Sequence, residues 1–125
     1  MGRLASFSDV PSLSHNAQNC VDAVRFTLKL KYGVSNPVKS YLIEEKLGLS
    51  GPEVRAIIHY LRTEGCPIGS CSQGYFYARD MSELESTVTH LSQRRNSIDA
   101  VLNGLRQSFM ENKQEALFEN QINSH

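Results

Sequence analysis

The sequence contains no tryptophan, only three cysteines and no long apolar run. Three thiols are too few for a disulfide framework, so a chain of 125 residues must fold around one apolar core. No stretch approaches the roughly 18 apolar residues of a membrane-spanning helix, and the N-terminal residues lack the apolar segment of a secretory signal. We therefore expect an intracellular globular protein that binds no membrane.

A net charge is also absent, because 13 Lys and Arg residues balance 13 Asp and Glu residues. A neutral chain argues against nucleic-acid binding, since phosphate contacts require basic side chains. The charges are nevertheless uneven, with eight basic and four acidic residues in 25–79 but four basic and seven acidic residues in 80–125. This asymmetry is compatible with a DNA-binding body joined to an element of another kind.

The catalytic motifs that a sequence can reveal are missing too, including a nucleophile elbow, a phosphate loop and a paired-histidine zinc motif. Cys66 and Cys71 are spaced C-x4-C, but a zinc site would need two further ligands, for which only His59 and His90 offer themselves. We therefore expect no enzyme, no cofactor and no metal site, and we interpret the thiols as structural.

The first helical pattern follows Ser14 or Asn16, either of which can cap a helix N-terminus. Four apolar residues then recur at helical spacing, namely Ala17, Val21, Val24 and Leu28. Gly33 is a natural stop. The pattern predicts a scaffold helix, preceded by a flexible arm over residues 1–14.

A second helix should start at Ser35-Asn36-Pro37, which offers a capping residue followed by proline at the first helical position. One side of this helix would carry Val38, Tyr41 and Leu42. Gly48 would end it in the left-handed conformation.

A third helix follows at once, because Ser50 and Glu53 form a capping box. Leu49 and Val54 lie on either side of this cap, in the positions of a hydrophobic staple. At 100° per residue, one face carries Val54, Ile57, Ile58 and Leu61, and the opposite face carries Pro52, Ala56, His59 and Thr63. The first of these faces should be buried.

Arg55 and Arg62 flank the exposed face of this third helix. Arginine in such a place can reach base edges or phosphates when a helix enters the major groove, and Arg55 is near the helix start, where base contacts concentrate. Two short helices joined by a glycine-containing turn are typical of the helix-turn-helix motif. The same motif also serves protein interaction.

Residues 65–78 predict a β-hairpin. A short strand leads into the turn-forming sequence Ser72-Gln73-Gly74, and Tyr75-Phe76-Tyr77 returns as an aromatic strand. Alternation places Phe76 on the buried face and both tyrosines on the other. The competing interpretation of the three aromatic residues is a platform that stacks the bases of single-stranded nucleic acid.

Together, residues 15–79 resemble the winged helix-turn-helix family. The resemblance is carried by Leu47-Gly48-Leu49-Ser50, Val54-Arg55, Ile57-Ile58, Leu61-Arg62, Gly65, Pro67-Ile68 and Gly74-Tyr75. It points in particular to small regulators and replication-associated proteins of phages and viruses. It implies sequence-specific binding of double-stranded DNA by a transcriptional regulator or a replication accessory protein, in the cytoplasm of a cell or of an infected host.

The resemblance assigns DNA contacts to Ser50, Pro52, Arg55, His59 and Arg62 on the third helix and to Ser70, Ser72 and Gln73 at the wing tip, and we add Lys39 to this set. The hairpin departs from many DNA-reading wings, because no Lys or Arg lies between residues 65 and 78. Its contribution would therefore come from hydroxyl, amide and backbone contacts with phosphate. The alternative is a winged-helix module that binds another protein within a larger assembly.

A capping box over residues 82–85, with Asp80 before it, marks the start of a long C-terminal helix. Its seam consists of Leu84, Val88, Leu91, Arg95, Ile98, Leu102, Leu105 and Phe109, at alternating spacings of 4 and 3. This heptad pattern is typical of a coiled coil. We expect residues 80–110 to form a homodimer through the seven apolar seam residues, with a hairpin folded back on its own domain as the alternative, and residues 111–125 to be a polar tail.

The expected fold class is thus mainly α with a small β-hairpin. It consists of a winged helix-turn-helix domain and a long C-terminal helix that forms a dimeric coiled coil. The expected partners are double-stranded DNA and a second copy of the chain, with no small-molecule ligand.

Overall fold

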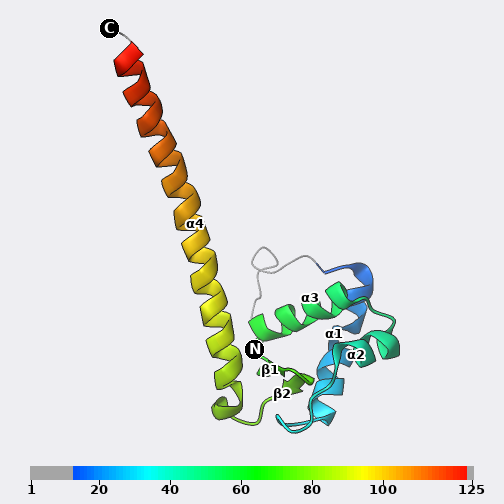
Figure 1. Ribbon diagram of the computed structural model, residues 1–125. Helices are drawn as coiled ribbons and strands as arrows, with labels where there is room; N and C mark the ends of the chain where they lie inside the picture. The colour runs from blue at the N-terminus through cyan, green and yellow to red at the C-terminus, as the bar shows by residue number, and fades with distance from the viewer. Residues whose placement is uncertain (1–12, 124–125) are drawn as a thin grey trace. The chain divides into compact units, whose positions relative to one another are not determined.

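The computed structural model describes residues 13–123, with the side chains of 112, 113, 116 and 120–123 left aside. The chain is mainly helical, with a small antiparallel hairpin and a long C-terminal helix (Figure 1). The elements are α1 (His15–Leu30), α2 (Ser40–Leu47), α3 (Gly51–Thr63), β1 (Ile68–Cys71), β2 (Gly74–Tyr77) and α4 (Met81–Asn123). They belong to two compact units, which we call unit 1, ending at Thr87, and unit 2, beginning at Val88.

Helix α1 begins where the sequence predicts. The Ser14 Oγ caps it by accepting a hydrogen bond of 3.0 Å from the Ala17 amide. The predicted apolar face is buried at Ala17, Val24 and Leu28 and half-buried at Val21. The predicted flexible arm lies outside the described residues up to position 12. Its last two residues belong to the domain, because Leu13 packs against the core and Ser14 caps the helix.

The prediction that the second helix starts at Pro37 is wrong, since α2 begins at Ser40. The segment before α2 pairs with the hairpin instead. Val38 and Tyr75 exchange N–H···O bonds of 2.7 and 2.9 Å, and Tyr32 forms a further bridge with Tyr77. These long-range bonds hold the chain extended and override a local helix-start signal.

The later start also changes which side of α2 faces the core. Ile43 is 1% exposed, whereas Tyr41 and Leu42, which the sequence placed on one side of the helix with Val38, are 55% and 47% exposed. Val38 is buried, but as part of the extended segment. The sequence pattern therefore identified Val38 as a core residue and missed Ile43.

The turn between α2 and α3 is formed as predicted. Gly48 ends α2 in the left-handed conformation, with φ of 67°. Both bonds of the capping box are present, because the Ser50 side chain accepts from the Glu53 amide and the Glu53 side chain accepts from the Ser50 amide. Leu49 and Val54, on either side of the cap, are both buried.

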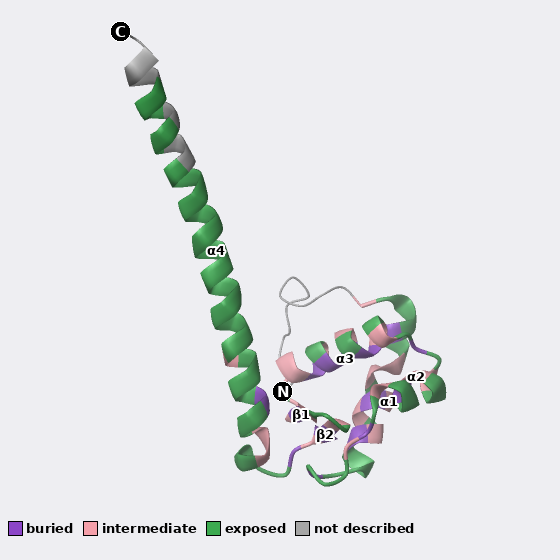
Figure 2. Ribbon diagram, in the orientation of Figure 1, coloured by how far each residue is buried: buried purple, intermediate pink, exposed green. Residues whose placement is uncertain are grey.

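The core of unit 1 lies where the first three helices meet the hairpin. Its buried cluster contains Ala17, Val24, Leu28, Val38, Ile43, Leu49, Val54, Ile57, Ile58, Leu61 and Ile68. The predicted apolar face of α3 is confirmed at all four positions. One side of this helix is buried while the opposite side reaches the surface (Figure 2).

Strands β1 and β2 form the predicted hairpin, with Gly69 opposite Phe76. Phe76 is buried and its two tyrosine neighbours are half-buried, as alternation predicts. Gly69 has to lack a side chain, because a Cβ there would collide with the Phe76 ring. Gly74 has a φ of 131°, and a Cβ there would collide with the main chain of Val38.

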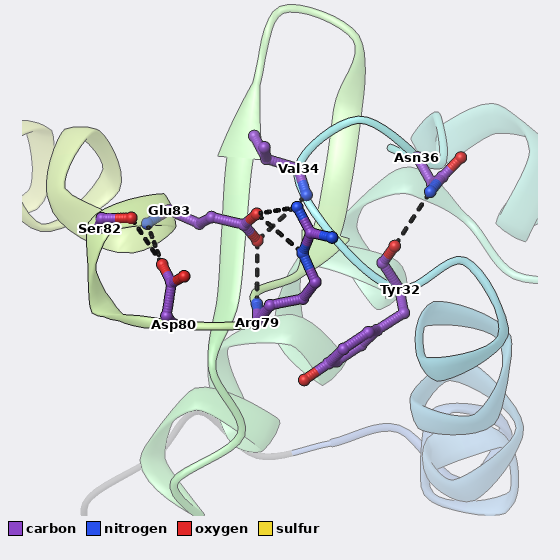
Figure 3. Close-up of polar contacts among 7 residues, drawn as sticks. All are labelled: Tyr32, Val34, Asn36, Arg79, Asp80, Ser82 and Glu83. Carbon is purple, nitrogen blue, oxygen red and sulfur yellow. Dashed lines mark hydrogen bonds and ion pairs between the residues drawn. The ribbon is translucent and has the colours of Figure 1, made fainter.

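The start of α4 differs from the predicted capping box. The helix begins at Met81, and the Asp80 Oδ1 accepts hydrogen bonds from the Glu83 amide (3.1 Å) and the Ser82 Oγ (2.6 Å). Asp80 is therefore the capping residue (Figure 3). The sequence offered both Asp80 and Ser82 as capping residues, and the structure uses Asp80.

Glu83 joins this end of α4 to the loop after α1. Its carboxylate accepts bonds from the Arg79 amide (2.9 Å), the Arg79 Nη2 (3.1 Å) and the Val34 amide (3.2 Å) (Figure 3). These bonds, the Arg79 amide first, hold the pKa of Glu83 below its ordinary value. Thr87 is buried and its Oγ1 accepts from the Ser70 amide at 3.0 Å. Unit 1 thus extends through Thr87, beyond the predicted boundary at residue 79.

Unit 2 is the continuation of α4. The described side chains of this unit are exposed except for Ser92, which is half-buried (Figure 2). The residues predicted as a polar tail continue the helix, which runs to Asn123. Residues 111–123 contain no Gly or Pro, so nothing in them stops a helix. In the described part of the chain, no helix combines the length and the apolar character needed to cross a membrane.

Candidate nucleic-acid interface

The surface side of α3 is the candidate interface. Pro52, Arg55 and His59 are exposed and Ala56 is half-buried, and we call these four residues the outer face of α3. They lie at positions 52, 55, 56 and 59, which is helical spacing, opposite the buried face. The sequence therefore predicted the orientation of this helix.

The N-terminus of α3 is fixed by α1 as well as by its own capping box. The Ser14 hydroxyl donates to the Glu53 Oε2 at 2.6 Å, and the Asn16 side-chain amide donates to the Gly48 carbonyl at 3.0 Å. The Ser14 bond, followed by the Ser50 amide, lowers the pKa of Glu53. The first turn of α3 is thus held in place before any ligand binds, which reduces the entropy cost of recognition.

Arg55 is the basic residue of the outer face. It is exposed, and the two ion pairs of residues 13–123, Arg25–Asp22 and Arg79–Glu83, do not involve it. Gly51 has no Cβ, but the position that a Cβ would take there serves as a reference point. The Arg55 Nη1 lies 3.5 Å from this point and the Glu44 Oε2 lies 3.7 Å from it. The guanidinium therefore rests over the first residue of α3, with an acidic side chain nearby.

Arg62 has a different place from the one that the helical pattern predicts. Its Nε donates to the Ile68 carbonyl at 2.8 Å, and its side chain is half-buried between α3 and β1. Burial lowers the pKa of Arg62, against a smaller opposing effect of Tyr75. The Nη2 is buried with no hydrogen-bond partner in the described part of the chain. Arg62 therefore braces the helix against the hairpin.

The hairpin tip consists of Ser72 and Gln73, both exposed, between the paired residues Cys71 and Gly74. The predicted place of Ser70 at the tip is wrong. It lies within β1, is half-buried, and its amide and carbonyl are both bonded to Thr87. Thr87, near the start of α4, therefore occupies the Ser70 main-chain amide, the donor that the sequence left available for phosphate.

Lys39 lies beside the hairpin, which the sequence could not reveal. The bridge between Val38 and Tyr75 brings the main chain of residue 39 against Gly74, since a Cβ on Gly74 would stand 2.8 Å from the Lys39 amide nitrogen. Lys39 is exposed. The long-range pairing thus places a positive residue next to a hairpin that has none of its own.

The aromatic strand is largely engaged within unit 1. The Tyr77 ring has the Lys29 Nζ at 5.5 Å and the Tyr32 ring at 6.2 Å from its centre, and burial raises the pKa of its hydroxyl. Tyr75 is half-buried. The Tyr77 ring thus has contacts within unit 1, which a platform for stacking bases would not need.

The three thiols form no disulfide with one another. Cys20 and Cys66 are half-buried and Cys71 is exposed. Within residues 13–123, no three His, Cys, Asp or Glu side chains gather into a group that could hold a metal ion.

Comparison of the chain with protein-family models, with curated proteins and with solved structures gives no match in any of the three.

Proposed function

We propose that unit 1 is a winged helix-turn-helix domain that binds double-stranded DNA sequence-specifically, and that the chain acts as a homodimer. Its role would be that of a transcriptional regulator or a replication accessory protein in the cytoplasm. The observation that carries the proposal is the outer face of α3, a capped and braced helix that presents an exposed, unpaired arginine in its second turn.

The arrangement around α3 supports this interpretation. A short turn joins α2 to α3, and a two-stranded hairpin follows α3. The extended segment before α2 pairs with the second strand of that hairpin. Three helices with a hairpin and an additional extended segment are the parts of a winged helix.

The chemistry of the outer face suits a major groove. An arginine near the start of a helix can bond the O6 and N7 atoms of guanine, while His59, one turn further on, can bond a base edge or a phosphate. Lys39, Ser72 and Gln73 would contact the DNA backbone from the hairpin side. Arg62 is left out of this set, since its guanidinium is used inside unit 1.

The homodimer is supported by unit 2. Its apolar seam residues Val88, Leu91, Ile98, Leu102, Leu105 and Phe109 are between 42% and 78% exposed. Covering half of each side chain with a second copy would contribute on the order of several kcal/mol. Such a gain is large enough to matter against the entropy cost of association.

Selection of bound sequences from random duplex DNA, followed by fluorescence anisotropy in a salt series, tests the proposal. The affinity for the selected duplex should fall steeply with salt. Arg55→Ala should weaken specific binding by about 1–3 kcal/mol, and Arg55→Lys should restore the charge without the bidentate contact. Lys31→Ala, which removes a charge from the end of α1, is the matched control. Equal binding by wild type and Arg55→Ala would contradict the assignment.

The second candidate function is protein binding by the same domain. It is favoured by Phe26 and Leu30, which are one helical turn apart on α1 and 63% and 64% exposed. The salt series separates the two functions, because a protein interface of this kind predicts no affinity for duplex DNA and no steep salt dependence.

A further inference from the structure

The seam of unit 2 has the same spacing in both directions along the helix. Its residues Val88, Leu91, Arg95, Ile98, Leu102 and Leu105 are separated by 3, 4, 3, 4 and 3 positions. All six side chains are exposed in the single chain. Because the spacing is the same in both directions, the seams of two copies can pack against each other about a two-fold axis, with each copy contributing the same residues.

Arg95 decides between the two directions in which two copies can pair. In a parallel pair, each seam residue faces its own counterpart, so Arg95 would face Arg95 of the partner subunit, with Arg94 beside each of them. Like charges held in a partly desolvated seam repel each other. The two ion pairs of the described residues do not involve Arg95, and the carboxylate of Asp99 lies four positions further along the same helix.

An antiparallel pair removes the conflict. With Val88 opposite Leu105 of the partner subunit, Leu91 faces the partner's Leu102 and Arg95 faces the partner's Ile98. Val88 and Leu105, and Leu91 and Leu102, then form apolar pairs, while Ile98 faces the partner's Arg95. The residue after Ile98 is Asp99, which is exposed, so the same alignment brings a carboxylate next to each Arg95 guanidinium.

The apolar seam residues do not choose between the directions. Parallel two-stranded coils favour a β-branched residue at the first apolar position of the heptad and leucine at the second. Val88, Leu91 and Leu105 follow this preference and Ile98 and Leu102 are reversed, so the direction rests on Arg95. A parallel pair would gain an ion pair between Arg94 and Asp99 of the partner subunit. Both groups are exposed, however, and such pairs contribute little.

We infer that two copies of the chain pair antiparallel through α4, with Val88 of each facing Leu105 of the other. The inference rests on the proposed homodimer and adds its direction and alignment. The positions of Val88 in the two copies are then 17 residues apart along the pair, or about 25 Å at 1.5 Å per residue. The two copies of unit 1 would leave the paired helices at separate points, one toward each end.

Cysteine cross-linking in the full chain tests the direction. Cys20, Cys66 and Cys71 are first replaced by serine, and circular dichroism and sedimentation check the fold and the oligomeric state. A tagged Val88→Cys chain is then mixed with an untagged Leu105→Cys chain and oxidised. The antiparallel pair predicts the mixed disulfide in about tenfold excess over either self-disulfide, because only that pair meets the Cα distance of a disulfide.

A control pair of cysteines and a sedimentation measurement distinguish a wrong direction from the absence of a dimer. Gln93→Cys and Gln107→Cys, which lie on the opposite side of α4, form the matched control and should give no cross-link in either direction. Self-disulfides of the Val88→Cys chain would overturn the antiparallel direction while leaving the dimer intact. A monomer by sedimentation would overturn the dimer as well. DNA binding is measured separately by anisotropy, so neither result depends on it.

Discussion

The Arg62 Nε donates to the main-chain oxygen of Ile68 at 2.8 Å, and this bond joins the last turn of α3 to the first residue of β1. The other arginine of the helix, Arg55, is exposed and takes part in neither ion pair of the described residues. Two arginines seven residues apart on one helix therefore have different tasks. One stabilises the contact between helix and hairpin, and the other is available to a ligand.

Replacing Arg62 should mainly reduce stability. Arg62→Ala removes a charge-assisted hydrogen bond and leaves the Ile68 carbonyl unpaired, so we expect a loss of about 1.5–3 kcal/mol in the free energy of unfolding. Urea denaturation measures it. Arg55→Ala is the matched control and should change stability by less than about 0.5 kcal/mol. If Arg62→Ala is as stable as wild type but binds DNA more weakly, Arg62 contacts DNA and does not mainly stabilise the fold.

The role of Arg62 shows where sequence reasoning reaches its limit. Helical periodicity fixes which side of α3 faces the core, because that side depends only on residues of α3 itself. The same periodicity places Arg62 beside the exposed side, yet the guanidinium bonds a carbonyl in a later strand. A helical pattern carries no information about where that strand returns.

The two helix starts that were predicted wrongly have different physical causes. Pro37 lies in a good local start signal, but Val38 pairs with the distant Tyr75 and keeps the chain extended. At α4 the choice is local, because Asp80 and Ser82 are both acceptable capping residues and Asp80 takes the role. The capping box of α3 and the left-handed Gly48 are local features without such a competitor, and both appear where the sequence predicts them.

The two glycines at positions 69 and 104 should respond in opposite directions to alanine. A Cβ at Gly69 would collide with the Phe76 ring, so Gly69→Ala should cost about 1–3 kcal/mol through overpacking. Gly104 lies inside α4 with nothing within 4 Å of its Cβ position, so Gly104→Ala should stabilise the helix by about 0.5–1 kcal/mol. Thermal unfolding followed by circular dichroism measures both. A Gly69→Ala variant with the same stability as wild type would contradict the close packing of the Phe76 ring against β1.

Lys39 should contribute to DNA affinity without contributing to sequence preference. Its main chain lies against the hairpin, and its side chain is exposed. If it contacts phosphate, Lys39→Ala should weaken binding to selected and random duplexes alike and reduce the salt slope by about one. The comparison is with Lys31→Ala in the same anisotropy assay. A change confined to the selected duplex would instead place Lys39 at a base.

The acid stability of unit 1 should depend on Glu83. Its carboxylate accepts bonds from the Arg79 main chain and side chain and from the Val34 amide, so its pKa in the folded chain lies below the ordinary 4.5. The unfolded chain therefore binds the proton more tightly than the folded one. It follows that the stabilisation is fully present above about pH 4.5 and is lost as the pH falls through the lower, folded pKa.

Glu83→Gln isolates this contribution, because an amide has only one acceptor oxygen and turns its NH₂ group toward donors. The variant should be less stable than wild type at pH 7, and the two should converge as the pH falls below about 4. Urea denaturation between pH 3 and pH 7 measures the difference. The control is Glu85→Gln, since Glu85 is exposed two residues further along α4. Glu53 and Asp80 also have lowered pKa values, so both variants keep a remaining acid dependence. A constant gap between Glu83→Gln and wild type at every pH would show that the loss comes from packing and not from the charge.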